Sequence, residues 1–216
     1  MALLDTLLPP ACAGCGRFGV MLCDACLAAF RPPGDPGDRF VAADAGMVIG
    51  EAVTLAVAAF AYEGPLRKVL QRVKYVGAAR VAGTLADASL PALRMLLAIS
   101  GEAPLVPVPL HPARERERGF NQAALIADAL SRGASLPVRR ILVRDRATTK
   151  QHRLDRAARL HNLAGAFRVA DGLRAPPVVI VVDDILTTSA TMEACAAVLR
   201  AAGCERAYGF AVAREV

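Results

Sequence analysis

The chain has 216 residues, a length that fits one ordinary domain with a small addition and argues against a coiled coil, a repeat array or a large multidomain machine. Hydrophobic residues make up 55% of the sequence and charged residues 21%, so there is enough apolar material for a core and global disorder is excluded. The formal net charge of +6 favours an anionic partner, such as a phosphate, a nucleotide or a nucleic acid, and charge alone does not choose among them.

No segment has the pattern of a membrane span or a secretory signal. The apolar runs, for example 52–61 and 178–182, are well short of the roughly 18 residues that a transmembrane helix requires. Residues 1–11 carry Asp5 but no Lys or Arg, and so lack the basic start of a secretory signal. We therefore expect a cytoplasmic protein without membrane insertion.

Four of the six cysteines form a C-x2-C-x7-C-x2-C pattern: Cys12, Cys15, Cys23 and Cys26. Two such knuckles let four thiolates converge on Zn²⁺, with Gly14 and Gly16 relieving backbone strain in the turns. Two disulfides are the alternative, which the reducing compartment expected for this chain disfavours. Four Cys ligands leave no open position for water, so the predicted zinc is structural. We expect Cys195 and Cys204 to pack as small buried hydrophobic side chains.

The composition changes after the cysteine pattern. Residues 31–46 are rich in Pro, Gly and Asp, which indicates a linker or an exposed loop. We therefore predict a zinc module over 1–30, a linker over 31–46 and a second domain over 47–216.

Helices and strands alternate in the second predicted domain. Apolar residues at helical spacing predict its helices, and short apolar or β-branched runs predict its strands. Because strands that alternate with helices form a parallel sheet flanked by those helices, the predicted fold class is α/β. In chain order the predicted elements are helices at 66–76 and 81–99, a strand at 105–110, a helix at 121–132, extended chain at 138–143, a strand at 178–182, a helix at 187–202 and a strand at 207–213.

The most informative segment is 178–192, VVIVVDDILTTSATM. A buried strand delivers two carboxylates, Asp183 and Asp184, at its carboxyl end, where ligands bind open α/β sheets. Small hydroxyl residues then open a helix, so that hydroxyls, backbone N–H groups and the helix dipole can converge on one phosphate. Carboxylates suit ribose hydroxyls or hydrated Mg²⁺, so the pattern predicts a sugar with a 5′-phosphate. An acidic pair that caps a helix after a buried strand is the alternative.

This segment resembles the 5-phosphoribosyl-1-pyrophosphate (PRPP) motif of type I phosphoribosyltransferases, in which a hydrophobic strand, two acids and a Thr-rich loop follow one another. The resemblance implies that Asp183 and Asp184 hold the ribose hydroxyls. It also implies that the 5′-phosphate is cradled by Thr187, Thr188, Ser189, Ala190 and Thr191. Most members have Gly in place of Ser189, and a Cβ there costs on the order of 1 kcal/mol or more if the backbone requires positive φ. Purine salvage enzymes carry an acidic residue at the position of Thr187, so purine salvage of that type is disfavoured.

Basic residues gather before this motif, since 12 Arg and Lys stand against 5 Asp and Glu between residues 111 and 159. In 107–122 a strand leads into a loop whose Arg114, Arg116 and Arg118 can offer bidentate contacts to a pyrophosphate. A solvated charge run with a helix cap at Asn121 is the alternative. Lys74 is a further pyrophosphate candidate, unless it is an ordinary surface lysine. The basic segment 144–167 is long for a connection, and as a flexible loop it could close over a polyanionic substrate.

In combination these motifs resemble the ComF family over nearly the whole chain. The matching parts are the tetracysteine pattern, LRKVLQRVKYVG at 66–77, VPVPLHPARERERGFNQ at 106–122, R-x-R-x-T-x-x-Q at 144–151, residues 162–167, VDDILTTSAT at 182–191 and AR at 213–214. That family, also called competence protein F or amidophosphoribosyltransferase-like, joins a zinc ribbon to a type I phosphoribosyltransferase fold. The resemblance thus implies a zinc ribbon over 1–30 and a phosphoribosyltransferase-like domain over 47–216. Some members are linked to DNA uptake, a role that the resemblance alone brings in.

Two functions remain open at this point. An enzyme would displace pyrophosphate from C1 of PRPP, with Mg²⁺ and the arginines stabilising the departing pyrophosphate. Its catalytic residues would be Asp183, Asp184 and Arg118, and its flexible loop would contribute Arg144, Thr149 and Gln151. The alternative is a non-catalytic adaptor that keeps a nucleotide pocket and contacts single-stranded DNA or a competence helicase. Trp is absent and few Phe or Tyr lie in the basic stretch, which weakens base stacking but leaves backbone contacts open.

Overall fold

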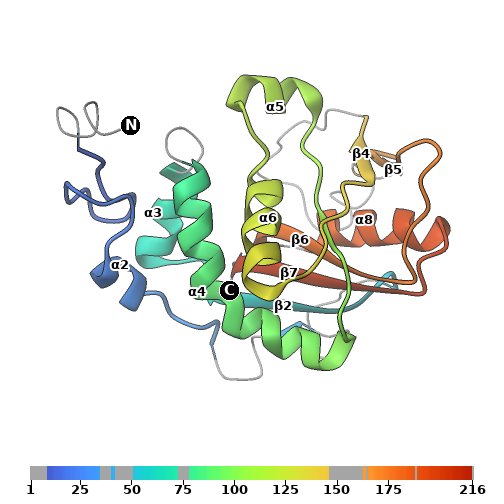
Figure 1. Ribbon diagram of the computed structural model, residues 1–216, viewed down its shortest axis with the longest axis horizontal. Coiled ribbons are helices and arrows are strands. Elements are labelled where there is room, and N and C mark those ends of the chain that lie inside the picture. Colours follow the sequence, from blue (N-terminus) through green and yellow to red (C-terminus); the bar gives the residue numbers. More distant parts are fainter. Residues whose placement is uncertain are drawn as a thin grey trace.

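A central β-sheet organises the protein (Figure 1). The computed structural model describes residues 9–34, 40–41, 51–72, 78–145, 163, 165–187 and 189–215. The strand order in the sheet is β1-β2-β7-β6-β3. Its strands are β1 (Phe40–Val41), β2 (Val53–Ala61), β3 (Leu105–Pro107), β6 (Val178–Leu186) and β7 (Arg206–Arg214). The last four run parallel and β1 pairs antiparallel with β2, so the predicted α/β class with a parallel sheet is confirmed.

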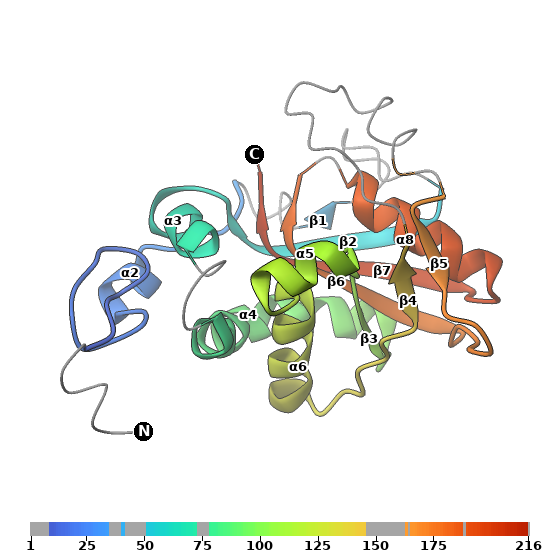
Figure 2. The same cartoon turned by 90° about the horizontal axis from the view of Figure 1, so that it is seen from above.

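Helices flank both faces of this sheet (Figure 2). On one face lie α4 (Ala78–Ser100) and α6 (Gln122–Ala134), and on the other lie α8 (Ala190–Ala201) and a two-stranded ribbon of β4 (Leu142–Arg144) and β5 (Phe167–Val169). Within β6, Ile180 and Val182 belong to the first core cluster, while Val179 and Val181 belong to the second. Because β6 is buried on both faces, it needs the continuous apolar run at its start.

The helix α4 is the one helix in the described ranges that is long and apolar enough to cross a membrane, over Ala79–Ser100. Its Leu85, Leu93 and Leu96 are buried in the first core cluster, and the helix packs against β2 and α6. Met95 is partly and Ile99 half exposed on its outer side. Packing against the sheet therefore accounts for the apolar composition of α4.

The predicted elements correspond to observed ones with shifted ends. Helices predicted at 66–76, 81–99 and 121–132 are α3 (Gly64–Arg72), α4 and α6, and strands predicted at 105–110, 178–182 and 207–213 are β3, β6 and β7. Where extended chain was predicted at 138–143, the structure has an isolated β-bridge between Val138 and Leu105, followed by the strand β4. Residues 73–77 lie outside the described part of the chain.

The junction between β6 and α8 differs most from its prediction. Asp183 pairs with Ala211 and Leu186 with Arg214, so β6 continues through the acids rather than ending before them. Ser189 has φ 61, in the left-handed region, and α8 therefore begins after it. The predicted helix start at residue 187 was wrong because this backbone conformation cannot belong to a right-handed helix.

A second difference concerns the predicted arginine loop, which forms the helix α5 (Pro112–Arg118). Its N-cap His111 accepts a hydrogen bond at Nδ1 from the N–H of Ala113 (3.2 Å). Gly119, with φ 78, ends the helix. Pro in the first turn and Gly after the last residue are typical helix signals, so α5 was predictable from the sequence.

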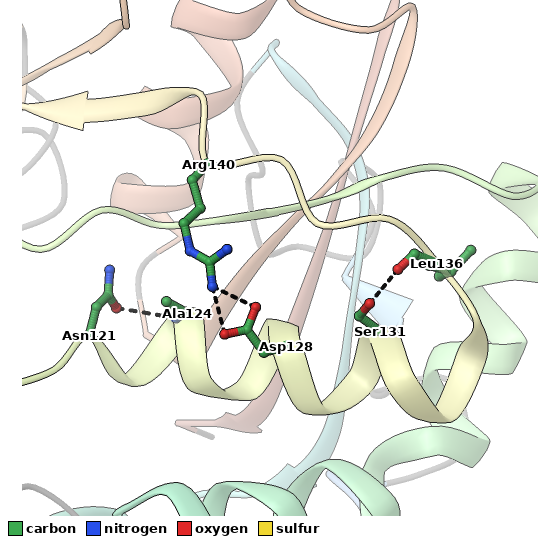
Figure 3. A network of polar contacts seen from close by, with 6 residues as sticks. All are labelled: Asn121, Ala124, Asp128, Ser131, Leu136 and Arg140. Atoms are coloured by element: carbon green, nitrogen blue, oxygen red, sulfur yellow. Dashed lines mark hydrogen bonds and ion pairs between the residues drawn. The ribbon is translucent and has the colours of Figure 1, made fainter.

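Polar contacts hold the start and the middle of α6 (Figure 3). Asn121 accepts a hydrogen bond from the N–H of Ala124 (3.3 Å), which confirms its cap, and its Nδ2 donates to the carbonyl of Val108 (2.9 Å). The guanidinium of Arg140 meets both carboxylate oxygens of Asp128 at 2.6 Å. Asn121 therefore caps α6 and holds the chain at the end of β3 with one side chain.

The N-terminal segment packs on the larger domain beside α3. The rings of Phe30 and Phe60 meet edge to face, with centroids 5.3 Å apart. Arg72 donates from Nη1 to the carbonyl of Ala13 (3.3 Å). The predicted linker contains β1, and its residues 35–39 and 42–46 lie outside the described ranges. The division into domains 1–30 and 47–216 stays a prediction.

Close packing of α8 on β7 yields a first prediction. A Cβ added at Gly209 would lie 2.0 Å from Sδ of Met192 and 2.8 Å from Cβ of Ala56. We expect Gly209→Ala to lower the free energy of unfolding, measured with urea, by about 1–3 kcal/mol, because overpacking displaces neighbours. Gly83→Ala is the control, since its Cβ meets nothing within 4 Å inside α4 and should be neutral or stabilise by up to about 1 kcal/mol. Equal stability of the two variants would contradict this packing.

Candidate functional site

The four N-terminal cysteines converge on one point. Their Sγ atoms all lie within 4.8 Å of one another. The Sγ of Cys12 is 3.7 Å from those of Cys23 and Cys26, and the Sγ of Cys15 is 3.7 Å from that of Cys23. Sulfurs bound tetrahedrally to Zn²⁺ at about 2.3 Å lie about 3.8 Å apart. All four cysteines are free thiols, so the cluster can hold a metal ion and its spacing fits structural zinc.

Local backbone geometry makes room for this cluster. A Cβ at Gly14 would lie 2.7 Å from Sγ of Cys26, so Gly14 serves by leaving space rather than by relieving strain. Gly16 has φ 83, which only glycine adopts at low cost, as predicted. Cys23 precedes the short helix α2 (Asp24–Ala28), and its N–H donates to Sγ of Cys12 (3.4 Å).

Electrostatics distinguish the thiols of the cluster. Burial opposes ionisation of Cys12, but backbone hydrogen bonds, led by that from Cys15, lower its pKa to about 6. Burial and the neighbouring thiols raise the pKa of Cys26 to about 12. A divalent cation among the sulfurs would favour the thiolate at every position, because it offsets the repulsion between them.

The second candidate site lies at the carboxyl end of β6. Asp183 and Asp184 are half-buried there, and the N–H of Asp184 donates to Oδ1 of Asp183 (2.8 Å). On one side β3 ends opposite Val182, and on the other β7 pairs with β6 as far as Leu186. The acids thus lie at the carboxyl edge of the parallel sheet, where α/β folds bind ligands.

An arginine at the end of β4 acts on this acid pair. Burial and the charge of Asp184 raise the pKa of Asp183 well above its usual range, and the charge of Arg144 opposes that shift. Arg144 ends β4 with its guanidinium 5.2 Å from the ring centroid of Phe167. Burial, together with the charge of Arg114, lowers the pKa of Arg144. Arg144 was predicted in a flexible loop, and the structure places it in a strand close to Asp183 and Arg114.

The turn between β6 and α8 takes its shape from Ser189. Its φ of 61 and ψ of −5 lie in the left-handed region, where a residue with a Cβ is strained and glycine is not. The carbonyl of Ser189 accepts the first helical hydrogen bond, from the N–H of Glu193 (2.8 Å), and its side chain caps nothing. The N–H groups of the first turn therefore lack intrahelical acceptors. Thr187 is exposed, Thr191 is half-buried and Ala190 is buried, while Thr188 lies outside the described residues.

The three arginines predicted to bind pyrophosphate lie on α5, which has no buried residue and stands away from the sheet (Figure 1). Arg114 and Arg118 are one turn apart and share a face, whereas Arg116 projects elsewhere. Within the described ranges none of the three pairs with a carboxylate, and Nη1 of Arg118 donates to Oε1 of Gln122 (3.3 Å). Lys74, Thr149 and Gln151 lie outside those ranges.

Two buried charged residues near this site had no role in the sequence analysis. The carboxylate of Glu193 accepts hydrogen bonds from the N–H groups of Ala52 (2.7 Å) and Val53 (3.1 Å), so it ties α8 to the start of β2. Arg214 is buried at the end of β7, opposite Leu186. The motif at 213–214 contained Arg214, but nothing in the sequence indicated the contacts of Glu193.

Comparison with known proteins gives several relatives, although no protein-family model matches the chain. Competence protein F of Haemophilus influenzae is 32% identical over 159 residues, which cover 71% of this chain and 69% of that protein. DNA utilization protein YhgH of Salmonella typhimurium is 33% identical over 146 residues, or 64% of this chain and 62% of that protein. Competence protein ComFC of Bacillus subtilis is 35% identical over 88 residues, or 41% and 34%.

The cysteine cluster yields a second prediction. Metal analysis of the purified protein should find about one equivalent of zinc, and Cys26→Ser should hold less than half of that, because three thiolates bind zinc more weakly than four. Lowering the pH should release the metal, since zinc requires thiolates and protons compete for them. Cys195→Ala is the control, because Cys195 is buried in the other core cluster and should leave the zinc content unchanged. Zinc-free wild-type protein with four titratable N-terminal thiols would contradict the assignment.

Proposed function

This chain belongs to the ComF family, and we propose that it binds PRPP with Mg²⁺ at the carboxyl end of β6 as a phosphoribosyltransferase-like protein that acts in DNA uptake. The observation that carries the ligand proposal is the left-handed turn at Ser189, which lies between an acid pair and a helix N-terminus. The DNA role rests on the names of the relatives, which refer to competence and DNA utilization.

The sugar and its 5′-phosphate would occupy the two halves of this edge. Asp183 and Asp184 would accept hydrogen bonds from ribose hydroxyls, because ionised carboxylate oxygens are acceptors and hydroxyls are donors. The phosphate would lie at the start of α8, where the N–H groups of Ala190 and Thr191 and the helix dipole favour an anion. Thr187 and Thr188 would add hydroxyls to this cradle.

The pyrophosphate would lie on the arginine side of the site. Arg114 and Arg118 share a face of α5, and Arg114 is close enough to Arg144 for their charges to repel. Such a concentration of positive charge is relieved by a polyanion. Arg116 and Lys74 remain candidates for the same group. Asp183 and Asp184 would hold Mg²⁺ together with the pyrophosphate, and the ion would supply positive charge beside the phosphate oxygens. The raised pKa of Asp183 supports this proposal, because a nearby cation favours the ionised carboxylate.

As an enzyme the chain would transfer the phosphoribosyl group to a nucleophile. The C1–O bond to pyrophosphate breaks as the nucleophile bonds to C1, and the pyrophosphate leaves with the electron pair. Asp183 and Asp184 would hold the sugar in place, and Arg118 would stabilise the negative charge of the leaving group. Arg144 would contribute from the end of β4, and Thr149 and Gln151 would belong to a loop that excludes water.

The second candidate function is a non-catalytic adaptor that binds single-stranded DNA or a competence helicase. The arginines of α5 favour it, because DNA backbones bind basic surfaces. Arg116 is exposed, Arg114 and Arg118 are half-buried, and none of them pairs with a carboxylate in the described ranges. In this case the zinc module over 1–30 and the domain over 47–216 would both contact the DNA or the helicase.

Binding of PRPP yields the third prediction. Saturating PRPP with Mg²⁺ should raise the thermal midpoint by about 5–10 °C, because ligand at 100 times Kd stabilises by about 2.7 kcal/mol. The shift should vanish in an Asp183→Asn, Asp184→Asn double variant. Asp128→Asn is the control, since Asp128 pairs with Arg140 on α6 and should keep the shift. No shift at millimolar PRPP, or an equal shift in the double variant, would count against the site.

DNA binding yields the fourth prediction, which tests the adaptor. Single-stranded DNA should bind with an affinity that falls as salt rises, because counterions are released, with a slope of about 0.7 per phosphate contact. Charge reversal at Arg153, Arg156 and Arg159, in the basic stretch outside the described residues, should weaken binding and reduce this slope. Reversal of the exposed Arg94 on α4 is the control. Salt-insensitive binding, or binding that the triple reversal leaves unchanged, would refute this prediction.

A further inference from the structure

We infer that the hydroxyl of Ser189 is a direct ligand of the phosphate in this site, a contact that glycine at the same position cannot make. The inference rests on the proposed function, because it concerns the same anion site. It goes further by assigning a specific contact to the hydroxyl of Ser189, at a position where most phosphoribosyltransferases of this type have Gly.

The hydroxyl of Ser189 is buried without a partner. Its Oγ has no hydrogen bond within the part of the chain that the structure describes, and the residue is 5% exposed. A buried hydroxyl without a hydrogen bond loses its interaction with water and gains nothing in exchange. Such groups are rare in folded proteins, and a ligand that completes the bond is a standard explanation.

The backbone of Ser189 adds a second cost. Its φ of 61 is a conformation that glycine adopts freely and serine does not. Glycine would avoid both the strain and the unpaired hydroxyl. Two separate features thus make serine unfavourable for the ligand-free fold, and a contact formed by the side chain on binding would offset them.

Ser189 adjoins the helix N-terminus, where an anion would lie. It is the N-cap of α8, and its carbonyl begins the helical hydrogen bonds by accepting from Glu193. It therefore adjoins the first-turn N–H groups, which lack intrahelical acceptors, and its side chain accepts a hydrogen bond from none of them. A phosphate bound by those groups has oxygens within reach of the N-cap, so the hydroxyl can donate to one of them.

Two substitutions separate the hydroxyl from the strain. Ser189→Ala keeps the Cβ and the left-handed backbone and removes only the oxygen. Ser189→Gly removes both. Titration calorimetry with PRPP and Mg²⁺, and with ribose 5-phosphate, measures affinity, while the thermal midpoint without ligand measures stability.

We expect Ser189→Ala to keep or raise the ligand-free midpoint and to weaken both ligands about tenfold, as the loss of a hydrogen bond to a charged group does. Ser189→Gly should raise the ligand-free midpoint further and weaken binding to a similar degree. If the hydroxyl had a purely structural role, Ser189→Ala would lower the ligand-free thermal midpoint and leave the affinity unchanged. If the hydroxyl binds the phosphate, the midpoint stays the same or rises and the affinity falls.

Unchanged or tighter binding in Ser189→Ala overturns the inference. If Ser189→Ala binds PRPP as the wild type does, while the Asp183→Asn, Asp184→Asn variant loses PRPP binding, the proposed function stands and the inference about the hydroxyl fails. If ribose 5-phosphate binds in a manner that depends on the hydroxyl while PRPP does not bind, the inference stands and the proposed function fails. If neither ligand binds the wild-type protein, both are overturned.

Discussion

The left-handed backbone at Ser189 is the constraint on which the candidate site depends. It lets the chain leave β6 and enter α8 in a short turn, so the positive end of a helix lies next to the edge that carries the acid pair. Neighbouring packing holds this arrangement, because Met192 fills the space over Gly209 and the carboxylate of Glu193 holds two N–H groups at the start of β2. The turn that we propose as the anion site is therefore ordered by the fold itself.

Opposite charges are arranged across this edge in a way that suits a phosphorylated sugar. Burial and the charge of Asp184 raise the pKa of Asp183, while the charges of Arg144 and Arg114 repel each other close to this carboxyl. A ligand with hydroxyls at one end and a pyrophosphate with its cation at the other would relieve both. The cysteine cluster packs beside α3, which follows the carboxyl end of β2, so it lies toward the same edge of the sheet (Figures 1 and 2).

The sequence predicted β6 and β7 from their continuous apolar runs, and the long helices α4 and α6 from the helical spacing of their apolar residues. It missed the strand β2, although the apolar run 52–61 covers it. It also predicted the cysteine cluster, whose spacing is set by local chain geometry. It missed α5 although His111, Pro112 and Gly119 mark its ends, and it started α8 too early because no local pattern shows that Ser189 is left-handed. The contacts of Glu193 join residues far apart in the chain, and such pairings follow from packing rather than from local sequence.

A phosphate that binds the turn between β6 and α8 can be followed through the backbone amide resonances of isotopically labelled protein during titration with PRPP and Mg²⁺. We expect the amides of Ala190 and Thr191 to shift first and furthest, because a phosphate oxygen accepts their hydrogen bonds. Saturable binding that leaves these amides unmoved and shifts resonances elsewhere would contradict this expectation.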